Sequence, residues 1–234
     1  MEIDTIDGDL FLKYFSHDDF KNNELEMSGN TINKTQDTAR VFFNNPIEFN
    51  SDLKKLIPEK ILNVTDIYPP NICIIDFILK NNLHNDKDFS LLDYGCGIPN
   101  LIYYLRKIGV QKVFGYDNWK QIEKEYAEKY LSLVGLDNDI LLNEKDVYLN
   151  NVKAISHIGY AITQNEFLKL VSSMDVKYIF SDYRFTSEPA EIGDGEGLIK
   201  FERKHINVPD KMIKNNGFYP EVIYDGLLVV YKRA

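Results

Sequence analysis

An acidic residue and two closely spaced glycines follow a short apolar run, and this segment restricts the possible folds more than any other. The apolar run ends in Asp93, and Gly95 and Gly97 follow with one residue between them. Glycine is needed where a chain turns sharply and its backbone must approach a ligand closely. A helix that starts after such a turn offers free N–H groups and the positive end of its dipole. The segment therefore predicts a ligand-binding turn between a strand and a helix.

Alternating apolar runs and amphipathic segments surround this turn. Short apolar runs predict successive strands at 90–93, 113–116, 140–142, 152–156 and 176–181. Asp225-Gly226 lies between two β-rich runs, 219–224 and 227–231, and this is a strong hairpin signal. Repeated βα units favour a parallel sheet. We therefore expect an α/β fold with a doubly wound, mostly parallel seven-stranded sheet and a C-terminal antiparallel hairpin.

The first 70 residues differ in composition from the rest of the chain. They are rich in Asn, Asp, Lys and Thr, and their aromatic residues follow no long clean period. We expect a helical and loop extension over residues 1–70 that acts as a lid, with the main domain over 71–234. Asn71 is expected to cap the first helix of that domain. Residues from Phe11 to Phe43 would line the site, although an oligomer interface or a disordered tail is the alternative.

Charge and cysteine content exclude several classes of protein. The 36 acidic residues outnumber the 27 basic ones, and a net charge of −9 repels nucleic acid unless a basic patch reverses the field. The two cysteines form neither a disulfide framework nor a metal-ligand pattern. No apolar run approaches the roughly 20 residues that span a bilayer, and the N-terminus lacks a signal-peptide layout. We expect a soluble, cytoplasmic protein without DNA or membrane partners. The sequence does not define its oligomeric state.

A second acidic residue narrows the type of ligand. Asp117 ends the second predicted strand, twenty residues after Gly97. In a doubly wound sheet this position faces the first turn, and a carboxylate there can accept hydrogen bonds from both hydroxyls of a ribose. A dinucleotide fingerprint requires glycine or alanine at position 100, which is Asn100. This residue and the missing substrate domain disfavour a nicotinamide enzyme.

These residues resemble the first motif of the class I (Rossmann-like) S-adenosyl-L-methionine (SAM)-dependent methyltransferase family. That motif is an acidic residue followed by x-Gly-x-Gly-x-Gly, and Asp93, Gly95 and Gly97 match it. Pro99 replaces the third glycine, which is compatible with the start of a helix because the missing N–H of proline is not needed there. The final hairpin is similar to the family's reversed seventh strand. The resemblance covers roughly residues 71–233.

The resemblance implies SAM as the cofactor and a role for each matching position. The glycine turn would hold the amino-acid part of SAM, Asp117 the ribose, and residues after the second and third strands the adenine. The implied cofactor-binding residues are Asp93, Gly95, Cys96, Gly97, Asp117, Asn118, Trp119, Asp146 and Val147. From the residues alone, Cys96 is a small turn residue rather than a nucleophile. Trp119 could equally be core, and Asp146 could cap a helix beginning near Val147.

The sequence defines the residues around the methyl acceptor less clearly than those around the cofactor. His157 follows the fourth predicted strand, where the family often keeps catalytic residues, and histidine suits a general base near neutral pH. A lone histidine is more often structural, and His205 is a weaker candidate. If 176–181 were strand four, Asp182 and Tyr183 would take the position of His157. No metal is expected, since the acidic stretch 191–197 is better interpreted as a loop.

The acceptor class follows from charge and from a missing motif. The Asn/Asp-Pro-Pro-Tyr/Phe sequence of enzymes that methylate base amines is absent after strand four or five. We expect transfer of a methyl group to an O or N acceptor on a small or sugar-like molecule. A protein or RNA methyltransferase is the alternative among enzymes. A non-catalytic SAM-fold subunit that serves as a partner interface is the alternative outside them.

Overall fold

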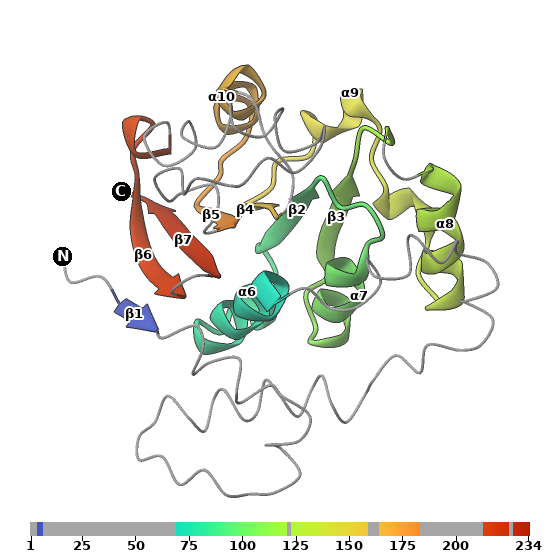
Figure 1. Cartoon of the computed structure of the whole chain (residues 1–234), viewed down its shortest axis with the longest axis horizontal. Helices are drawn as coiled ribbons and strands as arrows, with labels where there is room; N and C mark the ends of the chain where they lie inside the picture. Colours follow the sequence, from blue (N-terminus) through green and yellow to red (C-terminus); the bar gives the residue numbers. More distant parts are fainter. Residues whose placement is uncertain (1–3, 7–68, 121–122, 159–163, 183–212, 225–226) are drawn as a thin grey trace, which may run out of the picture.

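The computed structural model describes residues 4–6, 69–120, 123–158, 164–182, 213–224 and 227–234 (Figure 1). Within these residues, seven strands form one sheet in the order β1-β6-β7-β5-β4-β2-β3. The strands are β1 (Asp4–Ile6), β2 (Ser90–Tyr94), β3 (Lys112–Tyr116), β4 (Ala154–His157), β5 (Tyr178–Asp182), β6 (Phe218–Tyr224) and β7 (Leu228–Arg233). The helices of at least four residues are α6 (Pro69–Lys80), α7 (Asn100–Lys107), α8 (Lys124–Leu133), α9 (Glu144–Val147) and α10 (Gln164–Ser173).

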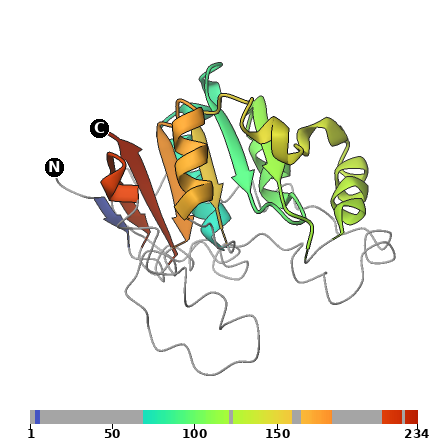
Figure 2. The same cartoon turned by 90° about the horizontal axis from the view of Figure 1, so that it is seen from above.

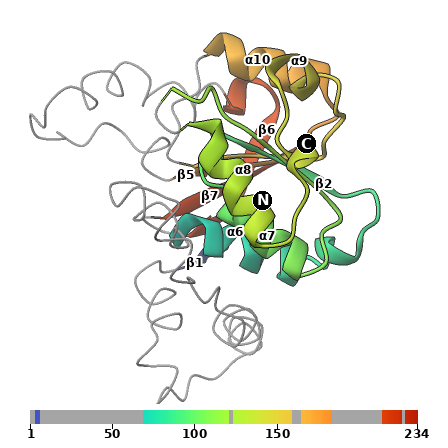
Figure 3. The ribbon, with the colours of Figure 1, turned by 90° about the vertical axis from the view of Figure 1, so that its right-hand side faces the viewer.

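Helices cover both faces of the sheet. Helices α6, α7 and α8 lie on one face, and α9 and α10 lie on the other (Figures 2 and 3). Strands β3, β2, β4 and β5 are parallel, whereas β7 is antiparallel to both β5 and β6. The doubly wound sheet and the C-terminal hairpin are thus confirmed.

Two apolar clusters separate along the sheet because strand side chains alternate between faces. Leu91 and Ala154 pack with residues of α6 and α7, whereas Leu92 and Ile155 pack with residues of α9 and α10. All five residues of β2 are buried, as expected for a parallel strand covered on both faces. Full burial of each leucine side chain contributes about 1.5–3 kcal/mol to folding. The two helical layers therefore enclose β2 on both faces and hold its carboxyl end in place.

The predicted strand at 140–142 is wrong. Asn138–Ile140 forms a 3₁₀ turn, and only Leu141 makes a parallel bridge, with Gly115 of β3. The three apolar residues are flanked by polar residues on both sides, and Asn and Asp favour turns through local hydrogen bonds. Helix α9 then begins at Glu144 and leaves no length for a strand.

The seventh strand of the sheet comes instead from the N-terminal segment. Strand β1 pairs in parallel with β6, with Asp4 opposite Val222. Only helices and loops are predicted for residues 1–70, so this strand is not predicted from the sequence. Residues 1–3 and 7–68 of that segment lie outside the described residues, and so do the aromatic residues predicted to line the site.

Helix α6 begins at Pro69, two residues before Asn71, the predicted N-cap. Proline is tolerated in the first turn of a helix, where N–H groups have no intrahelical acceptor. Pro69 and Pro70 therefore belong to the helix, and Asn71 lies inside its first turn rather than at the cap.

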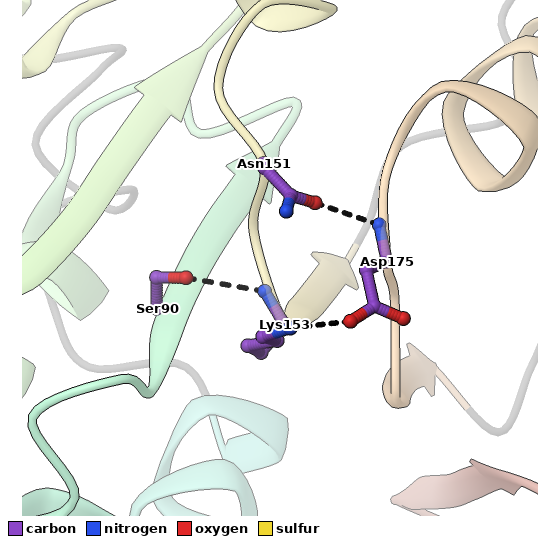
Figure 4. Close-up of polar contacts among 4 residues, drawn as sticks. All are labelled: Ser90, Asn151, Lys153 and Asp175. Carbon is purple, nitrogen blue, oxygen red and sulfur yellow. Dashed lines mark hydrogen bonds and ion pairs between the residues drawn. The ribbon is translucent and has the colours of Figure 1, made fainter.

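Polar contacts join the strands at their amino ends (Figure 4). Ser90 Oγ accepts the Lys153 N–H at 3.1 Å, and Asn151 Oδ1 accepts the Asp175 N–H at 2.7 Å. Lys153 Nζ also forms an exposed ion pair with Asp175, a type of pair that adds little stability. These contacts fasten the amino edge of β2, β4 and the segment before β5. No helix of the described residues is long and apolar enough to cross a membrane.

Candidate functional site

The turn after β2 adopts a conformation that requires its glycines. Gly95 and Gly97 have φ angles of 88° and 49°, in the left-handed region that residues with a side chain rarely adopt. The N–H groups of Gly95 and Cys96 donate to the Tyr116 carbonyl oxygen at 2.7 and 3.0 Å. The turn is therefore fastened to the carboxyl end of the neighbouring strand, β3. The two glycine positions singled out by the sequence meet a real backbone requirement.

Asp117 joins the loops that follow β2 and β3. Its Oδ2 accepts the Gly97 N–H at 3.1 Å, and its Oδ1 accepts the Trp119 N–H at 2.9 Å. Burial raises the pKa of Asp117, while hydrogen bonds from the N–H groups of Trp119, Gly97 and Asn118 lower it. Trp119 itself has a φ of 58°, a strained value for a non-glycine residue. The carboxylate thus holds both loops in one fixed arrangement.

Asp93 lies at the carboxyl end of β2 and is 7% exposed. Its Oδ1 accepts a hydrogen bond from Ser156 Oγ at 2.7 Å. Burial raises the pKa of Asp93 to about 7, with the Ser156 hydrogen bond lowering it and the charge of Asp117 raising it. Sequence reasoning missed Ser156. The only signal for it is its place on the predicted fourth strand, which becomes informative once β4 is known to pair with β2.

Gly115 allows the glycine turn and α7 to approach β3. A Cβ atom on this residue would lie 2.7 Å from Ile102 Cδ1 and 2.9 Å from Cys96 Sγ. Burial raises the pKa of the Cys96 thiol well above its usual value, and the charges of Asp93 and Asp117 raise it further. A thiol that stays protonated is a poor nucleophile. The structure thus supports the interpretation of Cys96 as a small turn residue.

The residues predicted to contact adenine occupy different environments. Asn118 is exposed, and its Oδ1 accepts the Lys120 N–H at 3.0 Å. Trp119 is partly buried and packs against a cluster that contains Cys96 and Ile98. The adenine role of both residues stays a prediction.

Asp146 and Val147 lie in α9 rather than before a helix. This helix ends at Val147, so the alternative of a helix beginning there is wrong. Asp146 accepts a hydrogen bond from Asn143 Nδ2 at 3.2 Å, and Val147 is buried in the core beneath α10. The cofactor-binding role of Val147 stays a prediction. The contact of Asp146 with the adenine amine stays a prediction.

His157 is the last residue of β4 and has no exposed surface. It lies opposite Ser181 of β5 in the parallel register. On the same face, Tyr94 Oη donates to Glu166 Oε1 at 3.3 Å. Because β4 lies between β2 and β5, the run 176–181 is strand five and not strand four. The role of His157 as a base stays a prediction, and it requires the buried ring to become accessible.

The described residues contain no cluster of three His, Cys, Asp or Glu side chains that could hold a metal ion. His205, Tyr183 and the acidic stretch 191–197 lie outside the described residues.

Comparison with known proteins places this arrangement in a known fold. No protein-family model and no curated protein sequence matches the chain. A Staphylococcus aureus protein assigned as a caffeoyl-CoA O-methyltransferase matches with a TM-score of 0.54 and 17% identity, over 79% of this chain and 93% of that chain. Magnesium protoporphyrin IX methyltransferase from Synechocystis, solved with S-adenosylhomocysteine (SAH), matches with a TM-score of 0.47 and 13% identity. The match covers 97% of this chain and 99% of that chain. A Methanococcus maripaludis protein assigned as a SAM-dependent methyltransferase gives 0.46 and 16%, over 77% and 95%.

The sheet order, the two helical layers and the glycine turn define a doubly wound α/β protein whose glycine turn follows β2, between β4 and β3 in the sheet. More narrowly, the chain has the fold of the class I SAM-dependent methyltransferases.

Proposed function

We propose that this protein is a SAM-dependent methyltransferase that transfers a methyl group to an O or N acceptor on a small molecule. The observation that carries the proposal is the Asp117 carboxylate, which joins the glycine turn to the loop after β3. In a doubly wound sheet, ligands bind at this edge, outside the carboxyl ends of the central strands. The fold shared with solved methyltransferases agrees with this location.

The residues at this edge suit the parts of SAM. Gly97, Trp119 and Asn118 donate backbone hydrogen bonds to Asp117, and a carboxylate has about four acceptor sites, so capacity for a ribose hydroxyl remains. The buried Asp93 carboxylate suits a cationic group. The start of α7 offers N–H groups and a positive dipole end to a carboxylate. Together these features favour a ligand with a ribose and a zwitterionic amino acid.

SAM supplies a methyl group on a positively charged sulfur, and the protein's contribution is to position the two reactants. Holding an acceptor in line with the methyl group removes much of the entropic barrier. A covered site would also exclude water. The segment predicted as a lid, apart from β1 and the start of α6, is proposed as this cover on the evidence of its sequence. A base is needed only when the acceptor must lose a proton early, and His157 is the proposed candidate.

A small-molecule acceptor fits the net charge of −9, which opposes nucleic acid binding. We place the enzyme in the cytoplasm on the evidence of its sequence.

Calorimetric titration of the full chain with SAM, SAH, NAD and NADP tests the cofactor. SAM and SAH should bind and raise the melting temperature by linkage, and the nicotinamide cofactors should not. Asp139→Ala, at an exposed carboxylate, serves as a control variant that should bind like the wild type. Heat for NAD with none for SAM or SAH would overturn the proposal. Binding of SAM without methylation of any small-molecule acceptor tested would favour the non-catalytic subunit.

A further inference from the structure

Two asparagine side chains meet where α6 and α7 begin, next to the glycine turn. Asn71 lies in the first turn of α6 and Asn100 is the first residue of α7. Asn71 Nδ2 donates to Asn100 Oδ1 at 3.4 Å. The two residues are 8% and 5% exposed, so the pair is buried although both side chains are polar. The cofactor motif includes neither residue.

The second polar atom of the Asn71 amide is unsatisfied. Asn71 Oδ1 is buried and accepts no hydrogen bond in the structure. Buried polar side-chain atoms nearly always have a partner, so an exception in a well-packed region calls for an explanation. Nδ2 of the same amide donates to Asn100, so the atom of the Asn71 side chain that has no partner is the acceptor Oδ1.

The surroundings of this acceptor favour a positive charge. Leu91 packs on the α6 and α7 face of the sheet, and Asp93 lies two residues further along β2, so its side chain is on the same face. Asn100 follows Gly97 by three residues and therefore lies at the same end of β2. A buried carboxylate and a free carbonyl oxygen thus lie on one face and at one edge, beside the turn.

We propose that Asn71 Oδ1 accepts a hydrogen bond from the α-ammonium group of SAM, with Asn100 positioning the amide. This inference rests on the proposed function and extends the site to a helix that the glycine motif does not include. The atom without a partner is an acceptor, and it favours an ammonium over a carboxylate because a carboxylate needs donors. The N–H groups at the start of α7 remain for the carboxylate of the same amino acid.

The test compares two ligands that differ only in this group. Calorimetric titration of the full chain uses SAH and its desamino analogue, in which hydrogen replaces the α-amino group. A charge-assisted hydrogen bond gives a difference in Kd of about tenfold or more, so the wild type should prefer SAH by about that factor. In Asn71→Ala this preference should fall severalfold, while the nearby Asp93 carboxylate maintains the remainder. Asn71→Asp, which keeps an acceptor oxygen, should retain at least the wild-type preference.

Asn81→Ala is the matched control, because Asn81 follows the other end of α6 and is exposed. It should show the wild-type preference. If Asn71→Ala does not fold, Asn71→Leu replaces it, since leucine fills a similar volume without an acceptor. An unchanged preference in the Asn71 variant, or equal binding of both ligands by the wild type, overturns the inference. A wild type that binds neither ligand overturns the proposed function itself, which is a distinct result.

Discussion

The backbone N–H of Gly97 donates a hydrogen bond to Asp117 Oδ2 at 3.1 Å. The two residues are twenty positions apart in the sequence, yet this contact joins the loops after the two adjacent strands β2 and β3. Because Asp117 also accepts the Trp119 N–H, one side chain fixes the backbone of both loops. A site whose loops are already ordered loses less conformational entropy on binding.

The first prediction concerns Asp117. Asp117→Ala should weaken SAM binding by roughly ten- to a hundredfold, because charge-assisted hydrogen bonds to the ribose are worth about 1.5–3 kcal/mol. Circular dichroism should show that the fold survives. Asp139→Ala, at an exposed carboxylate, should leave the affinity unchanged. Wild-type affinity in Asp117→Ala would show that the ribose is not bound here.

The second prediction concerns stability and pH. The pKa of Asp93 is raised to about 7 by burial, whereas an unfolded aspartate titrates near 3.9. Between these values the folded protein binds more protons than the unfolded chain, so this residue's contribution to stability falls as pH rises from about 4 to about 7. The free energy of unfolding, measured with urea, should decrease from pH 5.5 to pH 8 by a smaller amount in Asp93→Asn than in the wild type. Equal pH dependence in the two proteins would contradict the assignment.

The third prediction concerns proton release on binding. SAM carries positive charge, which favours the ionised form of Asp93, so SAM binding near pH 6 should release a proton from this carboxyl group. Affinity should therefore be lower at pH 5.5 than at pH 8 for the wild type. Titrations in two buffers of different ionisation enthalpy measure the released proton directly. Asp93→Asn should lose the buffer dependence, and a wild type without it would sink the prediction.

The sequence predicts the features that depend on local chemistry. Gly95 and Gly97 stand out because a strand-to-helix turn requires positive φ angles, and both residues have them. Asp117 stands out because the carboxyl ends of adjacent parallel strands meet at one edge. The hairpin at 225–226 is likewise a local turn signal. In each case the feature depends on a few residues that are close in sequence, or on the pairing of two adjacent strands.

The sequence does not predict the features that depend on distant contacts. Ser156 supports Asp93 across 63 positions, and Asn71 meets Asn100 across 29, so neither pair has a local pattern. The burial of His157 depends on packing over β4 and not on the residues next to it. Strand β1 is missed because three residues in a polar segment give too short a pattern, and its pairing with β6 spans the chain.

The fourth prediction concerns a buried contact between α6 and β6. Tyr224 Oη donates to Asp76 Oδ2 at 2.7 Å, and the same oxygen lies 2.6 Å from Lys80 Nζ. Tyr224→Phe removes one donor from a fully buried carboxylate, which should lower the free energy of unfolding by about 1–3 kcal/mol. Tyr219→Phe is the control, because Tyr219 lies on the same strand and is 49% exposed. Urea unfolding should show a loss only for Tyr224→Phe, and equal stability of the two variants would contradict the prediction.

The fifth prediction concerns the close approach of α7 to β3. A Cβ atom at Gly115 would lie 2.7 Å from Ile102 Cδ1, so Gly115→Ala should destabilise the protein by about 1–3 kcal/mol. Ile102→Val deletes this Cδ1 atom and alone should cost about 0.5–1.5 kcal/mol. In the double variant the crowded atom is gone, so the total loss should be smaller than the sum of the two single losses. The contact of 2.9 Å with Cys96 Sγ remains, so the double variant should still be less stable than the wild type. Urea unfolding of the four proteins gives the coupling free energy, and strict additivity would show that Ile102 does not limit this position.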